Sequence, residues 1–204
     1  MRADISVSFA QPKGSVTGAM RRKIVFHRSE RLLLRPVWPE DWSAVHAAIN
    51  DEGIVRNLAS APWPYSEQHA REFAAKSHDP YSPRFAVTLA ERGALIGCIG
   101  LDPVEHDPDA LEVGYWIARG AWGNGYASEA GRSVIAVARM MGAKRLEAGH
   151  YVDNPASGRV LQKIGFVRRP GTVMHRSLGR GTLVETAQYA LDLEDEASEL
   201  SKAA

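Results

Sequence analysis

The stretch of sequence that decides the fold of this chain is Trp122-Gly123-Asn124-Gly125-Tyr126-Ala127-Ser128-Glu129-Ala130. It follows residues 111–118, whose pattern is typical of a β-strand. Apolar side chains then recur at helical spacing, at Ala127, Ala130, Val134, Val137, Ala138 and Met141. Glycine lets the backbone approach a ligand closely, and the unpaired N–H groups at a helix start attract anions. The strand, turn and helix together therefore predict a site for a phosphate-bearing ligand.

Two familiar glycine motifs do not fit this turn. A P-loop requires Gly-Lys-Ser/Thr, and no such run follows Gly123 or Gly125. A dinucleotide-binding fingerprint requires a third Gly or Ala, and Ser128 stands at that position. It also requires an acidic residue about 20 positions further on at the end of a second strand, and none stands there. The remaining alternatives are another phosphate ligand or a simple tight turn, and a lone Gly-x-Gly would favour the tight turn.

The glycine turn does not stand alone, because a second punctuated unit begins at Asn154. Asn154 is a natural helix N-cap, and Pro155 suits the first helical position. Gly165 can close this helix in a left-handed conformation, after which Phe166 enters the next strand. Two ordered units of this kind make a ligand site the better interpretation.

Together these units resemble the GNAT acetyltransferase superfamily, and within it the branch that acetylates the N-termini of ribosomal proteins. The superfamily motif Gln/Arg-x-x-Gly-x-Gly/Ala aligns with residues 122–127, and the run Trp-Gly-x-Gly-Tyr-Ala-Ser/Thr-Glu-Ala is typical of that branch. The unit Asn-x-x-Ser…Lys-x-Gly-Phe matches at Asn154, Ser157, Lys163, Gly165 and Phe166. Residues 112–117 resemble the family's fourth strand, and residues 31–36 followed by Asp41 resemble its opening strand and first helix. The resemblance covers residues 29–192, in order.

The coarse order of predicted elements alternates strands with helices. Strands are expected at 32–37, 84–90, 94–104, 111–118, 144–151, near Phe166 and at 185–193. Helices are expected at 41–50, 66–77 with Ser66 as cap, from the glycine turn to Met141, and at 155–164. This order predicts an α/β (α+β) fold with a mixed sheet. The resemblance implies the GNAT type of sheet, which is mostly antiparallel, with splayed central strands flanked by helices.

The length of 204 residues indicates one folded domain, which we place at residues 29–193. Residues 1–28 are expected to be a flexible extension, because they mix polar residues, Gly and Pro without periodicity. Met20 is an alternative start. Residues 194–204 are expected to be a charged tail.

Composition narrows the class of function. Lys and Arg number 25 against 24 Asp and Glu, so we expect no broad positive field and no direct contact with nucleic acid. The single cysteine, Cys98, excludes an internal disulfide and fits a reducing cytoplasm. No run is long enough to cross a membrane. The histidines lack metal-ligand spacing, so no metal is expected, and His150 is interpreted as structural. A homodimer through the C-terminal strand is left open.

The resemblance implies acetyl-CoA as the cosubstrate. The glycine turn would hold its pyrophosphate by backbone N–H groups, and the exposed edge of the fourth strand would pair with the pantetheine arm. Asn154 resembles the family residue that bonds this arm, with N-capping as its other role. The residues expected to bind the cofactor are Tyr115, Trp116, Ile117, Ala118, Trp122, Gly123, Asn124, Gly125, Tyr126, Ala127, Ser128 and Asn154.

Direct acetyl transfer needs a neutral amine, a polarised thioester carbonyl and a proton for the departing thiolate. Glu112 stands where the family commonly places a carboxylate base, with a surface or salt-bridged Glu as the alternative. The family's usual Tyr acid falls on Leu161, so that role is vacant. In the resembled branch a Ser at the position of Ser157 is proposed to protonate the thiolate, and a purely structural helix-start Ser is the alternative. Tyr151 is a weaker candidate than Ser157 for protonating the thiolate.

Acceptor recognition is expected in residues 51–65, where Trp63 and Tyr65 supply aromatic walls or simply pack, and in residues 171–181. The resemblance implies an N-acetyltransferase that moves acetyl directly from acetyl-CoA to a primary amine, here a protein N-terminal amine. A small amine such as a polyamine, amino acid or aminoglycoside is the alternative acceptor. A non-catalytic acyl-CoA-binding module is the alternative function.

Overall fold

The computed structural model describes residues 26–76 and 82–193 of the chain. Its strands are β1 (His27–Arg28), β2 (Leu32–Pro36), β3 (Arg84–Leu89), β4 (Leu95–Val104), β5 (Asp107–Ile117), β6 (Arg145–Tyr151), β7 (Val167–Arg168), β8 (Val173–Ser177) and β9 (Thr182–Asp192). Its α-helices are α1 (Trp42–Ile49), α2 (Glu52–Val55), α3 (Glu67–Lys76), α4 (Tyr126–Met140) and α5 (Pro155–Lys163). Short 3-10 turns occupy Pro39–Asp41 and Arg119–Ala121.

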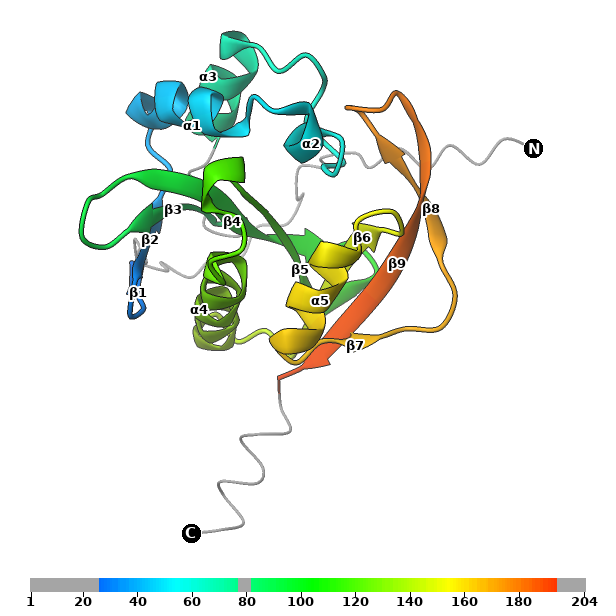
Figure 1. The fold of residues 1–204 in the computed structure, drawn as a ribbon. Coiled ribbons are helices and arrows are strands. Elements are labelled where there is room, and N and C mark those ends of the chain that lie inside the picture. Colours follow the sequence, from blue (N-terminus) through cyan, green and yellow to red (C-terminus); the bar gives the residue numbers. More distant parts are fainter. Residues whose placement is uncertain (1–25, 77–81, 194–204) are drawn as a thin grey trace, which may run out of the picture.

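The strands form a nine-stranded sheet in the order β1-β2-β3-β4-β5-β6-β9-β7, with β8 added to β9 (Figure 1). All of these pairs are antiparallel except β5–β6. That parallel pair is short, because it joins only residues 110–112 to residues 145–147. Beyond Glu112 no strand among the described residues pairs with this edge of β5, so the sheet is splayed at its centre. This confirms the predicted mixed, mostly antiparallel sheet.

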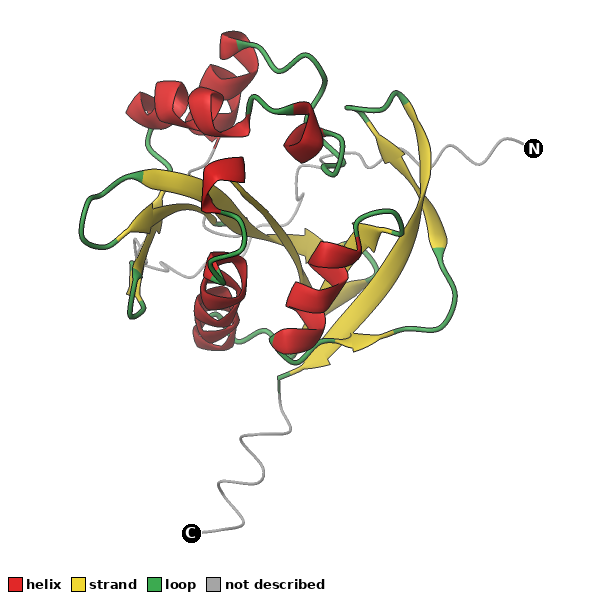
Figure 2. Ribbon diagram, viewed as in Figure 1, coloured by secondary structure: helices red, strands yellow, loops and turns green. Residues whose placement is uncertain are grey.

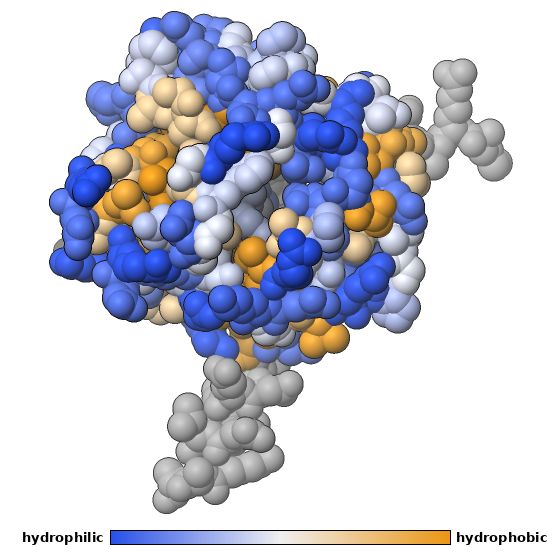
Figure 3. Space-filling model, viewed as in Figure 1, coloured by the Kyte–Doolittle hydropathy of each residue, from blue (hydrophilic) through white to orange (hydrophobic). Residues whose placement is uncertain are grey.

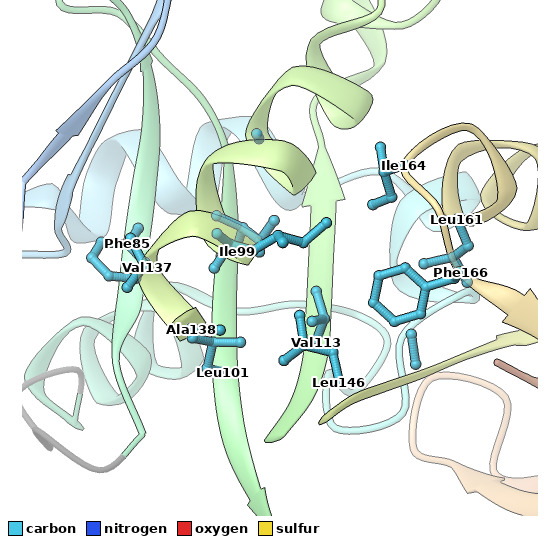
Figure 4. Packing of buried hydrophobic residues seen from close by; sticks show 14 of the residues in the cluster. Phe85, Ile99, Leu101, Val113, Val137, Ala138, Leu146, Leu161, Ile164 and Phe166 are labelled. Atoms are coloured by element: carbon cyan, nitrogen blue, oxygen red, sulfur yellow. The ribbon is translucent and has the colours of Figure 1, made fainter. Parts of the chain in front are cut away.

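Helices cover both faces of the sheet. Figure 2 shows α1 and α3 on one side and α4 and α5 on the other. The α4–α5 side holds the larger apolar cluster, in which Val113, Leu161 and Phe166 meet side chains of α4 and β4 (Figure 4). The α1–α3 side holds a second cluster that includes Cys98 and Trp116. Each fully buried aliphatic side chain stabilises the fold by about 1.5–3 kcal/mol, so these two clusters fix the helices against the sheet.

Capping residues and helix-closing glycines predicted most helix ends correctly. Ser66 precedes α3, and its Oγ accepts a hydrogen bond of 3.3 Å from the His69 N–H. Gly165 has a φ of 100° after α5, which is the left-handed conformation expected for a helix-closing glycine. Arg35 and Asp41, both in the opening motif, form an ion pair of 2.6 Å that joins β2 to the start of the first helical segment.

Three elements were not predicted, namely β1, α2 and β8. His27 and Arg28 were assigned to the flexible extension, but they pair with Leu34 and Leu33 of β2. The segment 171–181 was expected to be a loop, but Val173–Ser177 forms a hairpin strand with β9. Residues 1–25 of the extension, with Met20, and the tail at 194–204 lie outside the described residues. No helix among the described residues is long and apolar enough to cross a membrane.

Candidate active site

A cavity of about 520 Å³ lies where β5 and β6 stop pairing. Its volume falls within the range of about 300–1,000 Å³ that is common for ligand pockets. Figure 3 shows the surface hollowed near the middle of this face, with hydrophilic residues on either side. The walls come from residues 53–59, β5, residues 121–128, β6, the start of α5, and parts of β8 and β9. The splay of the sheet therefore creates the site.

The glycine turn forms one end of the cavity. Gly125 is the N-cap of α4, with a φ of 79° that side chains rarely adopt. The first N–H groups of α4 have no partner carbonyl within the helix, so this end of the cavity suits an anion. The predicted residues that line it are Trp122, Gly123, Gly125, Tyr126, Ala127 and Ser128.

Asn124 is the one predicted residue of the turn that does not line the cavity. Its Nδ2 turns back and donates to the Trp122 carbonyl at 2.9 Å, and its own carbonyl accepts from Arg31 Nη1 at 3.1 Å. The side chain of Asn124 therefore stabilises the turn itself and does not face the cavity. The aligned motif could not reveal this, because it fixes position along the chain and not the direction of the side chain.

The backbone of β5 offers fewer groups to a ligand than the sequence predicted. The Ala118 N–H donates to the Ile96 carbonyl of the β4 side at 2.8 Å. Backbone groups of a strand alternate between its two neighbours, so those of Trp116 also point toward β4, and those of Tyr115 and Ile117 point to the open edge. Ala118 does not line the cavity, whereas the other three residues do. The expected backbone partners are thus reduced to Tyr115 and Ile117.

Trp122 occupies one more backbone group of the open edge, because its Nε1–H donates to the Ile117 carbonyl at 2.6 Å. The Ile117 N–H stays directed toward the cavity. Asn154, across the cavity, occupies the N-cap position of α5, but its side chain makes no capping hydrogen bond. It is half-buried and lines the cavity. The capping role that the sequence predicted for the Asn154 side chain is therefore not observed.

Glu112 lies at the point where the two strands part. It faces the cavity and stands opposite Glu147 in register. The Glu112 residue is exposed to solvent in the cavity, yet desolvation by the surrounding protein raises the pKa of its carboxyl, and the nearby carboxylates of Asp102 and Glu147 raise it further. Glu147 is held by Arg169 at 2.8 Å, whereas the carboxylate of Glu112 has neither an ion pair nor a hydrogen-bond partner among the described residues. A carboxylate with a raised pKa is a stronger base than an ordinary one.

Ser157 lies in the first turn of α5, and its Oγ lies 2.8 Å from the Tyr115 hydroxyl. Both residues line the cavity. The hydroxyl of Ser157 is therefore engaged with a phenol instead of satisfying a backbone N–H of its own helix. Leu161, where the family's usual Tyr would stand, is fully buried in the apolar core.

His150 and Tyr189 form a second polar pair in the wall. His150 Nδ1 lies 2.8 Å from the Tyr151 carbonyl oxygen, so this nitrogen donates, and Nε2 can accept from the Tyr189 hydroxyl at 3.2 Å. Gly158 of α5 packs directly against both rings. His150 is thus held in place, as expected of a structural histidine, and at the same time faces the cavity.

The two segments expected to recognise the acceptor both reach the cavity. Gly53, Asn57 and their neighbours line it from the first segment, and His175 lines it from the second. Trp63 and Tyr65 do not line it. Tyr65 is only 6% exposed and packs in the second apolar cluster, so the packing alternative describes this residue.

A polar cluster joins these two segments and was not predicted. Arg180 Nη1 lies 2.8 Å from Asp153 Oδ2, and Arg180 Nε donates to the Arg56 carbonyl at 2.6 Å. The Leu178 N–H donates to the Ala59 carbonyl at 2.9 Å. The turn between β8 and β9 is therefore fastened to the segment after α2. No periodicity in the sequence could signal contacts between segments this far apart.

Known proteins agree with this fold. Residues 31–167 match the model of the acetyltransferase (GNAT) domain. The uncharacterized N-acetyltransferase YoaA of Bacillus subtilis is 28% identical over 80% of this chain and 94% of its own length. A GNAT-family acetyltransferase from Bacillus anthracis, of known crystal structure, has a TM-score of 0.72 at 26% identity, covering 82% of this chain and 98% of that one. This chain belongs to the GNAT acetyltransferase family.

Two further structures are similar in fold and carry coenzyme A. A ribosomal L7/L12 α-N-protein acetyltransferase in complex with coenzyme A has a TM-score of 0.71 at 19% identity, covering 83% of this chain and 99% of that one. A spermidine N-acetyltransferase from Vibrio cholerae in complex with CoA and spermine has a TM-score of 0.69 at 21% identity, covering 81% and 98%. These two enzymes are named for different acceptors, so the shared fold does not identify the acceptor.

Proposed function

We propose that this chain moves acetyl from acetyl-CoA directly to a primary amine, with no covalent enzyme intermediate. The observation that carries the proposal is one continuous cavity that joins the glycine turn, the open edge of β5 and the Glu112 carboxylate. Acetyl-CoA supplies a pyrophosphate, an amide-bearing arm and a thioester, and each has a counterpart along that cavity. We further propose that the enzyme works in the cytoplasm, which its single, buried and free cysteine fits.

Each proposed group of residues has one task. The α4 N-terminus and the glycine turn bind the pyrophosphate, and Asn154 bonds the pantetheine arm together with the edge of β5 at Tyr115 and Ile117. Glu112 removes a proton from the acceptor ammonium, directly or through water. Because Glu112 has a raised pKa, its affinity for that proton is closer to the affinity of the amine.

We propose a protein N-terminal amine as the acceptor. An α-amino group has a pKa of about 8 and a lysine of about 10.4, so a single carboxylate base suits the α-amine better. The Trp-Gly-x-Gly-Tyr motif, which is typical of the branch that acetylates ribosomal-protein N-termini, supports this choice. A polyamine is the second candidate, because Glu112 and Glu147 place two carboxyl groups at one cavity and would attract a polycation.

An acceptor screen tests the proposal. Acetyl-CoA is incubated with the protein and one of three acceptors: a peptide with a free N-terminus, the same peptide with a blocked N-terminus and one internal lysine, or spermidine. Released thiol and product mass are measured together. We expect acetylation of the free N-terminus only. Acetylated spermidine alone would move the assignment to small amines, and binding of acetyl-CoA without any acetylated product would indicate a non-catalytic module.

A further inference from the structure

A hydrogen bond between two hydroxyl groups connects the open edge of β5 to the first turn of α5. The Tyr115 hydroxyl lies 2.8 Å from Ser157 Oγ and 3.5 Å from the Ser157 carbonyl oxygen. The ring of Tyr115 packs against the apolar cluster beneath α4 and α5, which holds the hydroxyl in place. Neither the glycine motif nor the Asn-x-x-Ser motif includes this tyrosine side chain.

We propose that Tyr115 donates the proton that the departing CoA thiolate takes up, and that Ser157 is a positioning residue for the Tyr115 hydroxyl. The proposal rests on the proposed function, since it assigns one step within acetyl transfer. It also fills the role that is vacant at Leu161, which is fully buried and carries no acidic proton.

Acid strength favours the phenol over the serine hydroxyl as the donor. A phenol has a pKa of about 10, whereas an aliphatic hydroxyl is about as weak an acid as water, whose pKa is about 15.7. A thiol such as that of cysteine has a pKa of about 8.5, so the phenol is the better match. Burial raises the pKa of Tyr115, and the hydrogen bond with Ser157 opposes this only in part. The phenol therefore keeps its proton at neutral pH, ready for donation.

The position of Tyr115 along β5 is also suitable. It lies three residues from Glu112, and a strand advances about 3.3 Å per residue, so the two backbone positions are about 10 Å apart. The glycine turn lies beyond the other end of β5. An arm that runs from the turn to Glu112 along the open edge would pass Tyr115 just before it reaches the base. The leaving sulfur and the amine would then have separate partners.

The proton and electron pairs balance in this step. The acceptor nitrogen bonds to the thioester carbonyl carbon, and the carbon–sulfur bond breaks with its electron pair going to sulfur. The Tyr115 proton moves to that sulfur and gives the CoA thiol. In this step the Ser157 hydroxyl donates to the phenol oxygen and stabilises the phenolate, and the phenolic proton turns to the sulfur from its long contact of 3.5 Å with the Ser157 carbonyl oxygen. The nitrogen gives up its excess proton as the amide forms, and solvent water carries a proton back to the Tyr115 phenolate, while Glu112 releases the first proton of the ammonium to solvent.

The first test separates turnover from binding. We expect Tyr115→Phe to lower kcat by about 100-fold while the affinity for acetyl-CoA changes by less than about threefold, because the ring and the backbone stay. Ser157→Ala should lower kcat less, by about tenfold, since the phenol remains. A larger effect for Ser157→Ala than for Tyr115→Phe would make Ser157 the donor and overturn the proposal, as would a Tyr115→Phe variant with the kcat of the wild type.

The second test needs no acceptor. The pKa of the thiol of bound CoA is measured from thiolate absorbance, with the desulfo-CoA complex as blank. A hydrogen bond from Tyr115 stabilises the thiolate, so Tyr115→Phe should raise this pKa by about one unit, whereas Tyr189→Phe, whose hydroxyl is bonded to His150, should leave it unchanged. An unchanged thiol pKa in Tyr115→Phe would refute the proposal even if acetyl transfer occurs. Absence of transfer by the wild type would instead refute the proposed function.

Discussion

Arg31 and Glu129 form a tight ion pair that fastens the start of β2 to the first turn of α4, with 2.6 Å between Arg31 Nη2 and Glu129 Oε2. The Arg31 N–H and the Ser29 hydroxyl also donate to Glu129 Oε1, at 2.8 and 2.7 Å. Burial acts to raise the pKa of Glu129, but these hydrogen bonds outweigh it and the pKa is lowered. A carboxylate that would otherwise repel an anion at the helix start is thus neutralised by a residue of the opening motif.

Removal of Arg31 should weaken cofactor binding. Arg31→Ala leaves the Glu129 carboxylate unpaired beside the proposed pyrophosphate site, so we expect acetyl-CoA affinity to fall by about tenfold at low salt. Arg31→Ala combined with Glu129→Gln should recover part of that loss, because the repelling charge is gone. Calorimetric titration of both variants measures this. An equal loss in the single and the double variant would mean that Arg31 acts by contact with the ligand and not through Glu129.

The base role of Glu112 predicts a pH dependence with a definite sign. Its raised pKa means that the carboxylate becomes protonated at a higher pH than usual, so the rate of the wild type should fall as pH drops through that value. Glu112→Gln should lower kcat/KM by about 100-fold below pH 8. The loss should shrink above pH 8, where an α-amine of pKa about 8 loses its own proton. A loss that is constant across pH would remove the base role.

A substitution of Asp102 provides a second test of the pH dependence. Its carboxylate helps to raise the pKa of Glu112, and it is paired with Arg84 at 2.9 Å. Asp102→Asn removes the negative charge, so the acid limb of the rate profile should move to lower pH while the maximal rate is retained. A limb that stays in place would show that another group causes it.

Asn154 distinguishes a capping role from a ligand role. Loss of a working N-cap side chain typically costs about 1 kcal/mol of stability, but the side chain of Asn154 makes no capping bond. Asn154→Ala should therefore leave the free energy of unfolding unchanged within about 0.5 kcal/mol and weaken acetyl-CoA binding. Denaturant unfolding and calorimetry measure the two effects. Lower stability with unchanged affinity would restore the capping interpretation.

Gly158 should resist enlargement although it lies within a helix. Alanine gains about 1 kcal/mol over glycine in helix propensity, but a Cβ here would lie 2.5 Å from His150 Nε2 and 3.0 Å from the Tyr189 hydroxyl. Both rings are held by hydrogen bonds, so overpacking of about 1–3 kcal/mol should outweigh the gain. We expect a lower melting temperature for Gly158→Ala. Gly120→Ala, which meets open space, is the control, and equal melting temperatures for both variants would show that the two rings move aside.

Sequence predicted those parts of the molecule whose signals are local. The glycine turn, α4, α5 and the cap at Ser66 depend on residues within a few positions of one another, and each lies where the pattern placed it. The splayed sheet followed from the family resemblance. The line of residues from Glu112 to the glycine turn is brought together because β5 and α4 are consecutive in the chain.

The remaining features depend on contacts between distant segments. Tyr115 and Ser157 are 42 residues apart, and the strand pattern around Tyr115 says nothing about which helix its ring meets. The hairpin strand β8 reads as a loop because only pairing with β9 makes it extended. For Trp63 and Tyr65 the sequence leaves an aromatic wall and simple packing as alternatives, since an aromatic residue that packs and one that binds look alike in a sequence.

The central claim, that the glycine turn binds the pyrophosphate of acetyl-CoA, is tested most directly by calorimetric titration of acetyl-CoA into the wild type and Gly125→Val. Gly93→Val is the matched control, because Gly93 also has a positive φ, of 64°, but lies in the β3–β4 hairpin turn. We predict micromolar binding to the wild type and to Gly93→Val, and loss of binding in Gly125→Val with the fold retained by circular dichroism. Binding by Gly125→Val that equals the wild type, or no binding by the wild type, would contradict the account.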